Sequence, residues 1–282
     1  MKPVSSIVKA TALMLISEPL SLLLLGLALL TTTLSSAFHY HQFGEPTRLA
    51  RDASVSAVLV FTIIFAAFGA IKTFRREIES GTAALALSHA VSRRAFYFAK
   101  SIGILLSMIL FSSAIMFNAT TIVNGARLGG ELAKGSGDIA RLYGPSFLVS
   151  IVVFLMPLVL SALLNRFARF RFTLSAFLMT CAFSALSLAF RFDAEVAYSV
   201  TKTCLLAFLP AMIVGSVASA ASALLKSNFA GAIVAIAIGA MLPIMINFTR
   251  LAAPFEAMIG ALVMIAAVTL IGVELFNKRD LL

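Results

Sequence analysis

Residues 19–38 read PLSLLLLGLALLTTTLSSAF, a run without a single charged side chain. A helix needs about 20 predominantly apolar residues to cross the hydrocarbon core of a bilayer. Comparable runs recur at 54–71, 101–123, 146–164, 173–190, 203–221, 229–247 and 255–276. Continuous apolar runs of this length lack the alternation that the strands of a membrane barrel require. The sequence therefore predicts an all-α, polytopic transmembrane bundle of about eight spans.

The overall composition agrees with a membrane-embedded chain. Of the 282 residues, 61% are hydrophobic and 12% are charged, whereas a soluble domain carries about 25% charged residues. The formal net charge is +10, but the basic residues lie in the breaks between apolar runs and form no face with interleaved aromatics. We therefore expect the lipid bilayer to be the environment of the chain, and we expect no nucleic-acid partner.

The distribution of Lys and Arg predicts the orientation. If the N-terminus is cytoplasmic and eight spans alternate, 14 of the 22 Lys and Arg residues fall on the inner side. Cytoplasmic loops carry such an excess, so we expect a multi-pass protein of the plasma (inner) membrane with both termini in the cytoplasm. The span count is less constrained, because Pro210 interrupts the run 203–221 and the run 173–190 is short. Six spans plus a hairpin are the alternative.

The first 18 residues differ from the span that follows them. Lys2 and Lys9 are grouped with serines against Ile7, Val8 and later apolar residues. A helix lying in the inner membrane interface has this pattern, so residues 1–18 are predicted to form one. A simple cytoplasmic extension of the first span is the alternative. We expect 1–282 to be a single transmembrane domain.

The cysteines and histidines do not suggest a metal site. Cys181 and Cys204 lie within apolar runs and belong to no CxxC or Cys/His cluster. His39 and His41 have no third ligand nearby in the sequence, which favours interfacial anchoring. We therefore predict no bound metal.

The longest charged break is residues 72–100, KTFRREIESGTAALALSHAVSRRAFYFAK. It begins with mixed basic and acidic residues, continues through Ser80-Gly81-Thr82 and a short apolar stretch, and ends with two arginines and an aromatic run. A short helix lying on the inner membrane surface fits this pattern. Such a helix would present its charges to a soluble partner.

This segment resembles a motif of type 2 ABC exporter permeases, the membrane-spanning subunits of ABC transporters. In that family, E-x-E-x-G-T follows the second span and precedes a leucine-rich stretch, S-x-P-V-S-R and a lysine. The matching residues here are Glu77, Glu79, Gly81, Thr82, Ser88, Val91, Ser92, Arg93 and Lys100. Ala90 replaces the usual proline, and the family most often has six spans. Outside this segment, the resemblance is limited to a similar succession of apolar and polar stretches.

The resemblance implies that residues 72–100 form a cytoplasmic coupling loop with a coupling helix. That helix would insert into a cleft of a separately encoded ATP-binding subunit, present in two copies. Glu77 and Glu79 would make the main contacts, Gly81 and Thr82 would form a turn, and Arg93 would be an anchor near the lipid headgroups. The alternative interpretation is that these charges only fix topology.

The chain lacks the G-x-x-x-x-G-K-[ST] phosphate loop of an ATPase. It is therefore expected to be a transport subunit without its own catalytic site or cofactor. ATP and Mg would be bound by the partner subunit, and a second permease copy or a homologous permease would complete an ATP-driven export translocase.

Two other classes of function remain as alternatives. A secondary carrier usually needs ionisable residues deep in the membrane, and the clear spans have none at their centres. A membrane-embedded enzyme would need a polar catalytic constellation near one interface, and no such spacing is evident.

Small residues recur at every fourth position in two late segments. This spacing allows close approach of helices in lipid, so we expect helix packing there. The two sets are Gly215, Ser219 and Ala223, and Gly231, Ala235 and Gly239.

Overall fold

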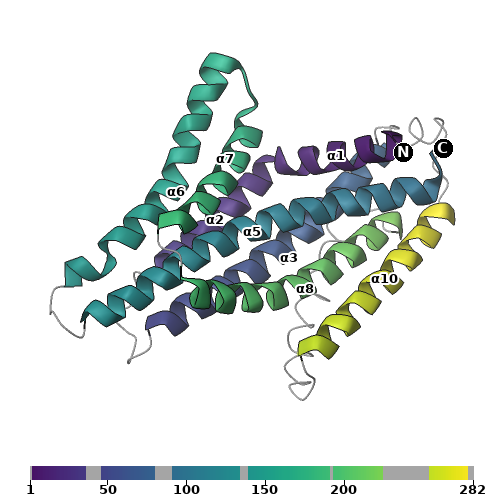
Figure 1. Cartoon of the computed structure of the whole chain (residues 1–282). Helices are drawn as coiled ribbons and strands as arrows, with labels where there is room; N and C mark the ends of the chain where they lie inside the picture. Colours follow the sequence, from purple (N-terminus) through teal and green to yellow (C-terminus); the bar gives the residue numbers. More distant parts are fainter. Residues whose placement is uncertain are drawn as a thin grey trace. The chain divides into compact units, whose positions relative to one another are not determined.

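A computed structural model describes residues 2–35, 46–79, 91–133, 139–190, 193–224 and 254–278. Within these ranges every regular element is a helix and none is a strand, which confirms the predicted all-helical class for this part of the chain. The elements, shown in Figure 1, are α1 (Lys2–Ile16), α2 (Pro19–Ser35), α3 (Pro46–Glu79), α5 (Arg93–Ala133), α6 (Ile139–Ala168), α7 (Phe172–Ser187), the 3-10 turn η2 (Leu188–Phe190), α8 (Ala194–Leu224) and α10 (Pro254–Lys278).

Five of these helices are long and apolar enough to cross a membrane. The qualifying segments are Ala50–Glu77, Arg93–Arg127, Ile151–Ala168, Ala194–Ser222 and Ile259–Asn277. A sixth span results if α1 and α2 are the two halves of one broken span. The chain is therefore a multi-pass membrane protein by the length and composition of its helices. The predicted run 229–247 lies outside the described residues, so the count of eight stays a prediction.

Two of the predicted runs differ from the helices that form there. Pro210 does not interrupt its run, because α8 continues as one helix through this position. Neighbouring helices and local adjustment let transmembrane helices tolerate proline. Helix α7 has 16 residues and is about 24 Å long at 1.5 Å per residue, which is shorter than the ~30 Å hydrocarbon core.

The break between α1 and α2 falls at Ser17 and Glu18. Pro19 takes the first position of α2, where its missing N–H is not needed. The carbonyl of Glu18 accepts hydrogen bonds from the backbone N–H groups of Ser21 (3.1 Å) and Leu22 (3.4 Å). The residues predicted to lie in the interface form a separate helix, α1, which ends before the first apolar run begins. Its place in the membrane interface stays a prediction.

The chain divides into two compact units that share its long helices. The first unit comprises Met1–Leu15, Thr62–Ile109 and Phe208–Leu282, and the second comprises Ile16–Phe61 and Leu110–Ala207.

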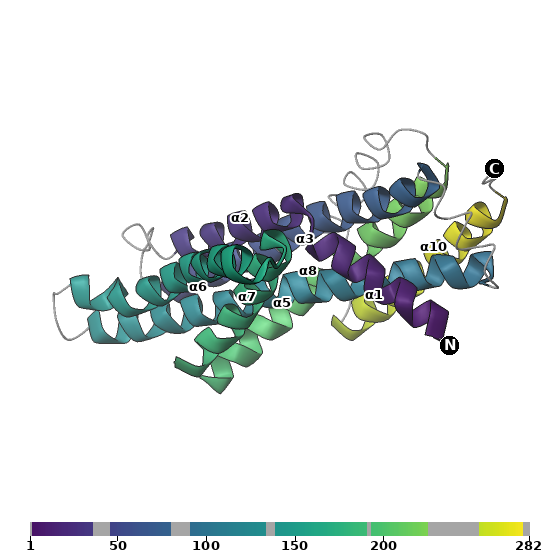
Figure 2. The ribbon, with the colours of Figure 1, turned by 90° about the horizontal axis from the view of Figure 1, so that it is seen from above.

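In the second unit, α6 and α7 form a hairpin and α2 packs against both of them (Figures 1 and 2). The turn between α6 and α7 contains Arg169 at φ 54°, a left-handed conformation that suits glycine. The second half of α5 runs parallel to α7, because Phe111 contacts Phe177 (6.5 Å between ring centroids) and Thr121 contacts Ser187 further along both helices (2.8 Å between the hydroxyl oxygens).

A buried polar layer lies at these contacts. The Asn118 Nδ2 donates to Thr32 Oγ1 at 2.8 Å, and Thr32 Oγ1 donates to the Leu29 carbonyl at 2.9 Å. Both side chains are buried. The pair therefore links α5 to α2 by a side-chain hydrogen bond.

In the first unit, small residues permit close helix contacts. A Cβ added to Gly103 of α5 would lie 2.7 Å from the Thr11 Cβ of α1, so only glycine fits this contact. Helices α8 and α10 run parallel here, because Ile213 packs with Ala261 near one end of the contact and Ala220 lies beside Gly272 near the other.

Candidate functional site

The candidate site lies in the first unit, where α3 and α10 end and α5 begins. The apolar segment of α3 ends at Glu77, and Lys72, Arg75 and Arg76 lie in its last two turns. A basic group near a helix C-terminus interacts favourably with the helix dipole. The charged break predicted from the sequence therefore starts as a continuation of α3 and not as a separate loop.

An ion pair joins the two ends of this break. The Lys100 Nζ donates a hydrogen bond to Glu77 Oε1. The Lys100 side chain is 1% exposed and that of Glu77 is 26% exposed. Lys100 Nζ also lies 5.7 Å from the centroid of the Phe96 ring, which is within the range of a cation–π interaction. Because a buried ammonium is costly without a counter-charge, Glu77 is the group that makes the burial of Lys100 tolerable.

Four aromatic rings pack next to this ion pair. Phe74 of α3 contacts Tyr97 of α5 (5.1 Å between centroids), and Phe276 of α10 lies 5.9 Å from both Phe96 and Tyr97. Aromatic pairs at such separations add stabilisation beyond their buried area. The rings therefore hold the ends of the three helices together.

One glycine makes this packing possible. A Cβ added to Gly272 would overlap Tyr97 Oη and would lie 2.7 Å from Tyr97 Cζ. Any larger residue at position 272 would displace the Tyr97 ring. The ring contacts of Tyr97 thus depend on a small residue in α10.

The start of α5 is fixed by two polar contacts. Ser92 Oγ accepts a hydrogen bond from the Ala95 N–H at 3.2 Å, which is the geometry of an N-cap. Arg93 Nη1 donates to the carbonyl of Asn277 at 2.9 Å, and so satisfies one of the last carbonyls of α10. Val91, immediately before the cap, is buried.

The structure brings together some of the residues that were predicted to couple the chain to an ATP-binding subunit. Glu77, Val91, Ser92 and Arg93 border the segment 80–90 on its two sides. Glu79 belongs to α3, but its side chain lies outside the described residues. The same holds for the whole of Gly81, Thr82 and Ser88. Arg93 was predicted as an anchor at the lipid headgroups, and in the structure its guanidinium binds α10.

The structure also describes some of the small residues that were predicted to allow close helix packing. Gly215 is buried in α8, where an added Cβ would lie 3.2 Å from Met108 Sδ and 3.6 Å from Ala66 Cβ. Ser219 Oγ donates to the Gly215 carbonyl at 2.7 Å, so its hydroxyl is satisfied within the helix. Ala223 belongs to α8, but its side chain is outside the described part, as are Gly231, Ala235 and Gly239.

Sequence reasoning did not find Phe74, Gly272, Phe276 or Asn277. The aromatic run at 96–98 gave a signal for one side of the cluster, but nothing in the sequence pairs it with α10. Across the ranges that the structure describes, no three His, Cys, Asp or Glu residues gather as a metal site would require.

No protein-family model, no curated protein and no solved structure matches this chain. The functional interpretation therefore rests on the residues of the chain itself.

Proposed function

We propose that the chain is the membrane-spanning permease subunit of an ABC exporter. It would work with two copies of a separate ATP-binding subunit, which bind ATP and Mg, and with a second permease copy or a homologous permease. The site at the ends of α3, α5 and α10 would lie on the cytoplasmic side of the inner membrane. Residues 72–100 would act as the coupling loop.

The observation that carries the proposal is the ion pair between Glu77 and Lys100. These residues are the first glutamate and the final lysine of the pattern E-x-E-x-G-T to Lys, and they lie 23 positions apart. Their contact brings the end of α3 beside the start of α5, on the two sides of residues 80–90 in the sequence. A segment that docks onto a soluble partner must be held in position by the helices on either side of it.

The contacts between these helix ends also suggest how a movement of the ATP-binding subunit would reach the membrane-spanning helices. The aromatic cluster and the contact between Arg93 and Asn277 tie α3, α5 and α10 together next to the segment. A displacement of the segment by a closing ATP-binding subunit would therefore move three helix ends together. Nucleotide can drive such a change only if it binds the two conformations with different affinity.

The test is co-purification of the chain from membranes with its candidate ATP-binding subunit, followed by measurement of ATPase activity. We expect Glu79→Ala to reduce both capture and activity, because Glu79 is the glutamate of the pattern nearer to the segment. Glu195→Ala is the matched control, because Glu195 is an exposed carboxylate of the second unit.

A companion variant separates docking from stability. Glu77→Gln combined with Lys100→Met removes both charges of the pair and leaves no buried charge unpaired. If no ATP-binding subunit associates with the wild-type chain, or if Glu79→Ala behaves as Glu195→Ala does, the proposal is wrong. The secondary-carrier and membrane-enzyme alternatives would then be reopened.

A further inference from the structure

The turn between α6 and α7 carries three arginines that the proposed coupling role does not use. Arg166 belongs to the last turn of α6, Arg169 to the connection, and Arg171 to the N-cap position of α7. All three are exposed. Among the described residues, none of the three side chains forms an ion pair or a hydrogen bond. Their guanidinium groups can therefore bind a ligand without first losing a partner there.

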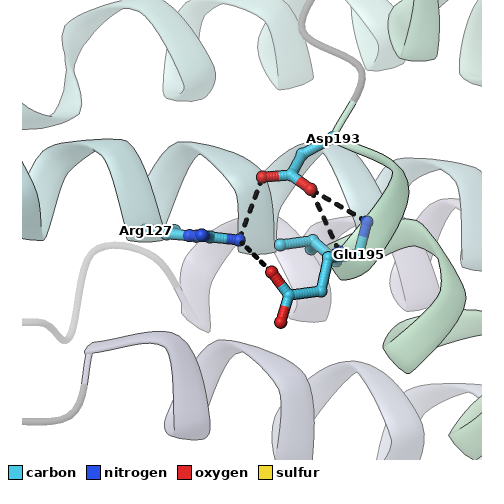
Figure 3. Close-up of polar contacts among 4 residues, drawn as sticks. Arg127, Asp193 and Glu195 are labelled. Carbon is cyan, nitrogen blue, oxygen red and sulfur yellow. Dashed lines mark hydrogen bonds and ion pairs between the residues drawn. The ribbon is translucent and has the colours of Figure 1, made fainter.

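Other arginines of the second unit are matched by carboxylates. Arg127 Nη1 donates to Asp193 Oδ2 at 2.9 Å and to Glu195 Oε2 at 3.4 Å, as Figure 3 shows. Arg51 Nε lies 3.6 Å from a carboxylate oxygen of Asp52. The turn between α6 and α7 thus differs from these positions, because its positive charge is not used within the described part of the unit.

An apolar groove begins beside this turn. Its volume is about 420 Å³, and residues of α2, α6 and α7 line it, all of them in the second unit. An apolar cavity of ~150 Å³ already holds a benzene molecule. The lining follows α2 from Pro19 to Leu30, which is about 17 Å at 1.5 Å per residue. It also includes Phe172 and Thr173, the residues that follow Arg171 in the chain.

The arginines lie at the edge of the apolar part of the hairpin. The apolar segment of α6 ends at Ala168 and α7 begins at Phe172, so three residues separate the two. Arginines at the end of an apolar helix extend to the depth of the lipid headgroups. Glu18 precedes Pro19 and adds one negative charge near this end of the groove. The three arginines therefore leave this edge net positive.

We propose that the groove and the turn bind one anionic phospholipid, with an acyl chain along α2 and the headgroup phosphate at Arg169 and Arg171. Guanidinium groups match the paired oxygens of a phosphate in geometry and charge. Phe167 and Phe170, 79% and 59% exposed, add apolar surface beside the headgroup, as interfacial segments do. The proposal requires only that the chain is embedded in a membrane, and it does not depend on coupling to ATP.

Native mass spectrometry of the full chain tests the headgroup contact. The protein is purified in mild detergent, freed of lipid, and titrated with phosphatidylglycerol or with phosphatidylcholine that has the same acyl chains. We expect the first phosphatidylglycerol to bind at least tenfold more tightly, because phosphatidylcholine has a phosphate but no net charge. Arg169→Gln/Arg171→Gln should bring the two lipids to equal affinity.

Two substitutions of one glycine test the groove. A Cβ added to Gly26, which lines the groove, would lie 3.5 Å from Phe154 Cε2, an ordinary van der Waals distance. Gly26→Ala therefore fits and should leave the affinity for both lipids within twofold of the wild type. Gly26→Leu fills part of the groove and should weaken both lipids at least tenfold, with the preference for phosphatidylglycerol retained.

A control removes the same charge elsewhere in the unit. Arg48→Gln/Arg51→Gln changes two arginines at the start of α3 that lie near Asp52, and it should leave the preference for phosphatidylglycerol unchanged. The variant at the turn should fold normally, because Arg171 makes no side-chain cap and glutamine at position 169 is as acceptable as arginine at its φ of 54°. Equal thermal unfolding by circular dichroism checks this.

The proposal is overturned if the wild type binds both lipids equally, if the control arginines matter as much as Arg169 and Arg171, or if Gly26→Leu binds lipid as Gly26→Ala does. An excess of inorganic phosphate, compared with sodium chloride of equal ionic strength, separates a lipid from a free anion. If phosphate alone displaces phosphatidylglycerol, the turn takes the free anion and the lipid is the wrong occupant. Retention of the lipid in both salts supports the proposal.

Discussion

The ion pair between Glu77 and Lys100 gives the sharpest prediction. Glu77→Gln keeps the size of the side chain but leaves the Lys100 ammonium, which is 1% exposed, without its counter-charge. Breaking a buried pair in this way costs about 3–5 kcal/mol. Because the Glu77 side chain is 26% exposed, water can partly replace the carboxylate. We expect a loss at the lower end, about 3 kcal/mol.

The reverse substitution should cost less. Lys100→Met removes the buried charge and keeps an unbranched side chain next to the Phe96 ring. It leaves the Glu77 carboxylate with partial access to solvent, so we expect a loss of about 1 kcal/mol. The double variant Glu77→Gln/Lys100→Met removes both charges of this ion pair and should also lose about 1 kcal/mol. The double-variant loss is then about 3 kcal/mol smaller than the sum of the single losses.

The assay is equilibrium unfolding in mixed micelles, followed by a thiol-reactive dye. Cys181 and Cys204 are free, and they are the only two cysteines of the chain. Both lie in the second unit, so their labelling reports the unfolding of that unit, and the loss of helical circular dichroism follows the first unit, which contains the ion pair. Glu195→Gln, an exposed carboxylate 83% accessible to solvent, serves as the control. Additive losses in the double variant would refute the reasoning, because they would mean that the two charges do not interact.

Three further substitutions test other parts of the structure. Gly272→Ala should destabilise the first unit by about 1–3 kcal/mol, because its Cβ overlaps Tyr97, and the loss of helical circular dichroism during unfolding would measure it. Arg169→Gly should stabilise the α6–α7 turn by about 1 kcal/mol, because it removes a left-handed residue with a Cβ, and a higher midpoint of unfolding would show it. Asn118→Leu should cost about 0.6 kcal/mol, a typical value for a hydrogen bond between membrane helices, in the same assay.

Each of these predictions has a control. Among the described residues, none has an atom within 4 Å of a Cβ added to Gly260, so Gly260→Ala should be neutral or stabilising. An equal loss at both glycines would contradict the steric argument. Arg166→Gly, within α6, should destabilise where Arg169→Gly does not. Thr32→Val should remove most of the effect of Asn118→Leu, and an unchanged effect would mean that the hydrogen bond contributes nothing.

Part of the candidate site was predictable from the sequence. The pattern from Glu77 to Lys100 marked the break between two apolar runs, and its ends do lie together in the structure. The contact between Arg93 and Asn277 joins positions 184 apart, and no local pattern relates them. The same is true of Tyr97 and Gly272. These contacts depend on which helix ends meet, and the composition of each helix does not specify its neighbour.

By itself, the sequence determined that the chain is a bundle of apolar helices, because only long uncharged runs match the thickness of a bilayer. It also located the charged break between residues 72 and 100. The tertiary structure decided which faces of the helices are buried. Helices such as α5 and α8 have no strongly apolar face that contrasts with a polar one, so hydrophobic periodicity cannot indicate their inner face. Close packing at small residues and pairing of the few polar groups make that choice, as at Gly103 against Thr11 and at Lys100 against Glu77.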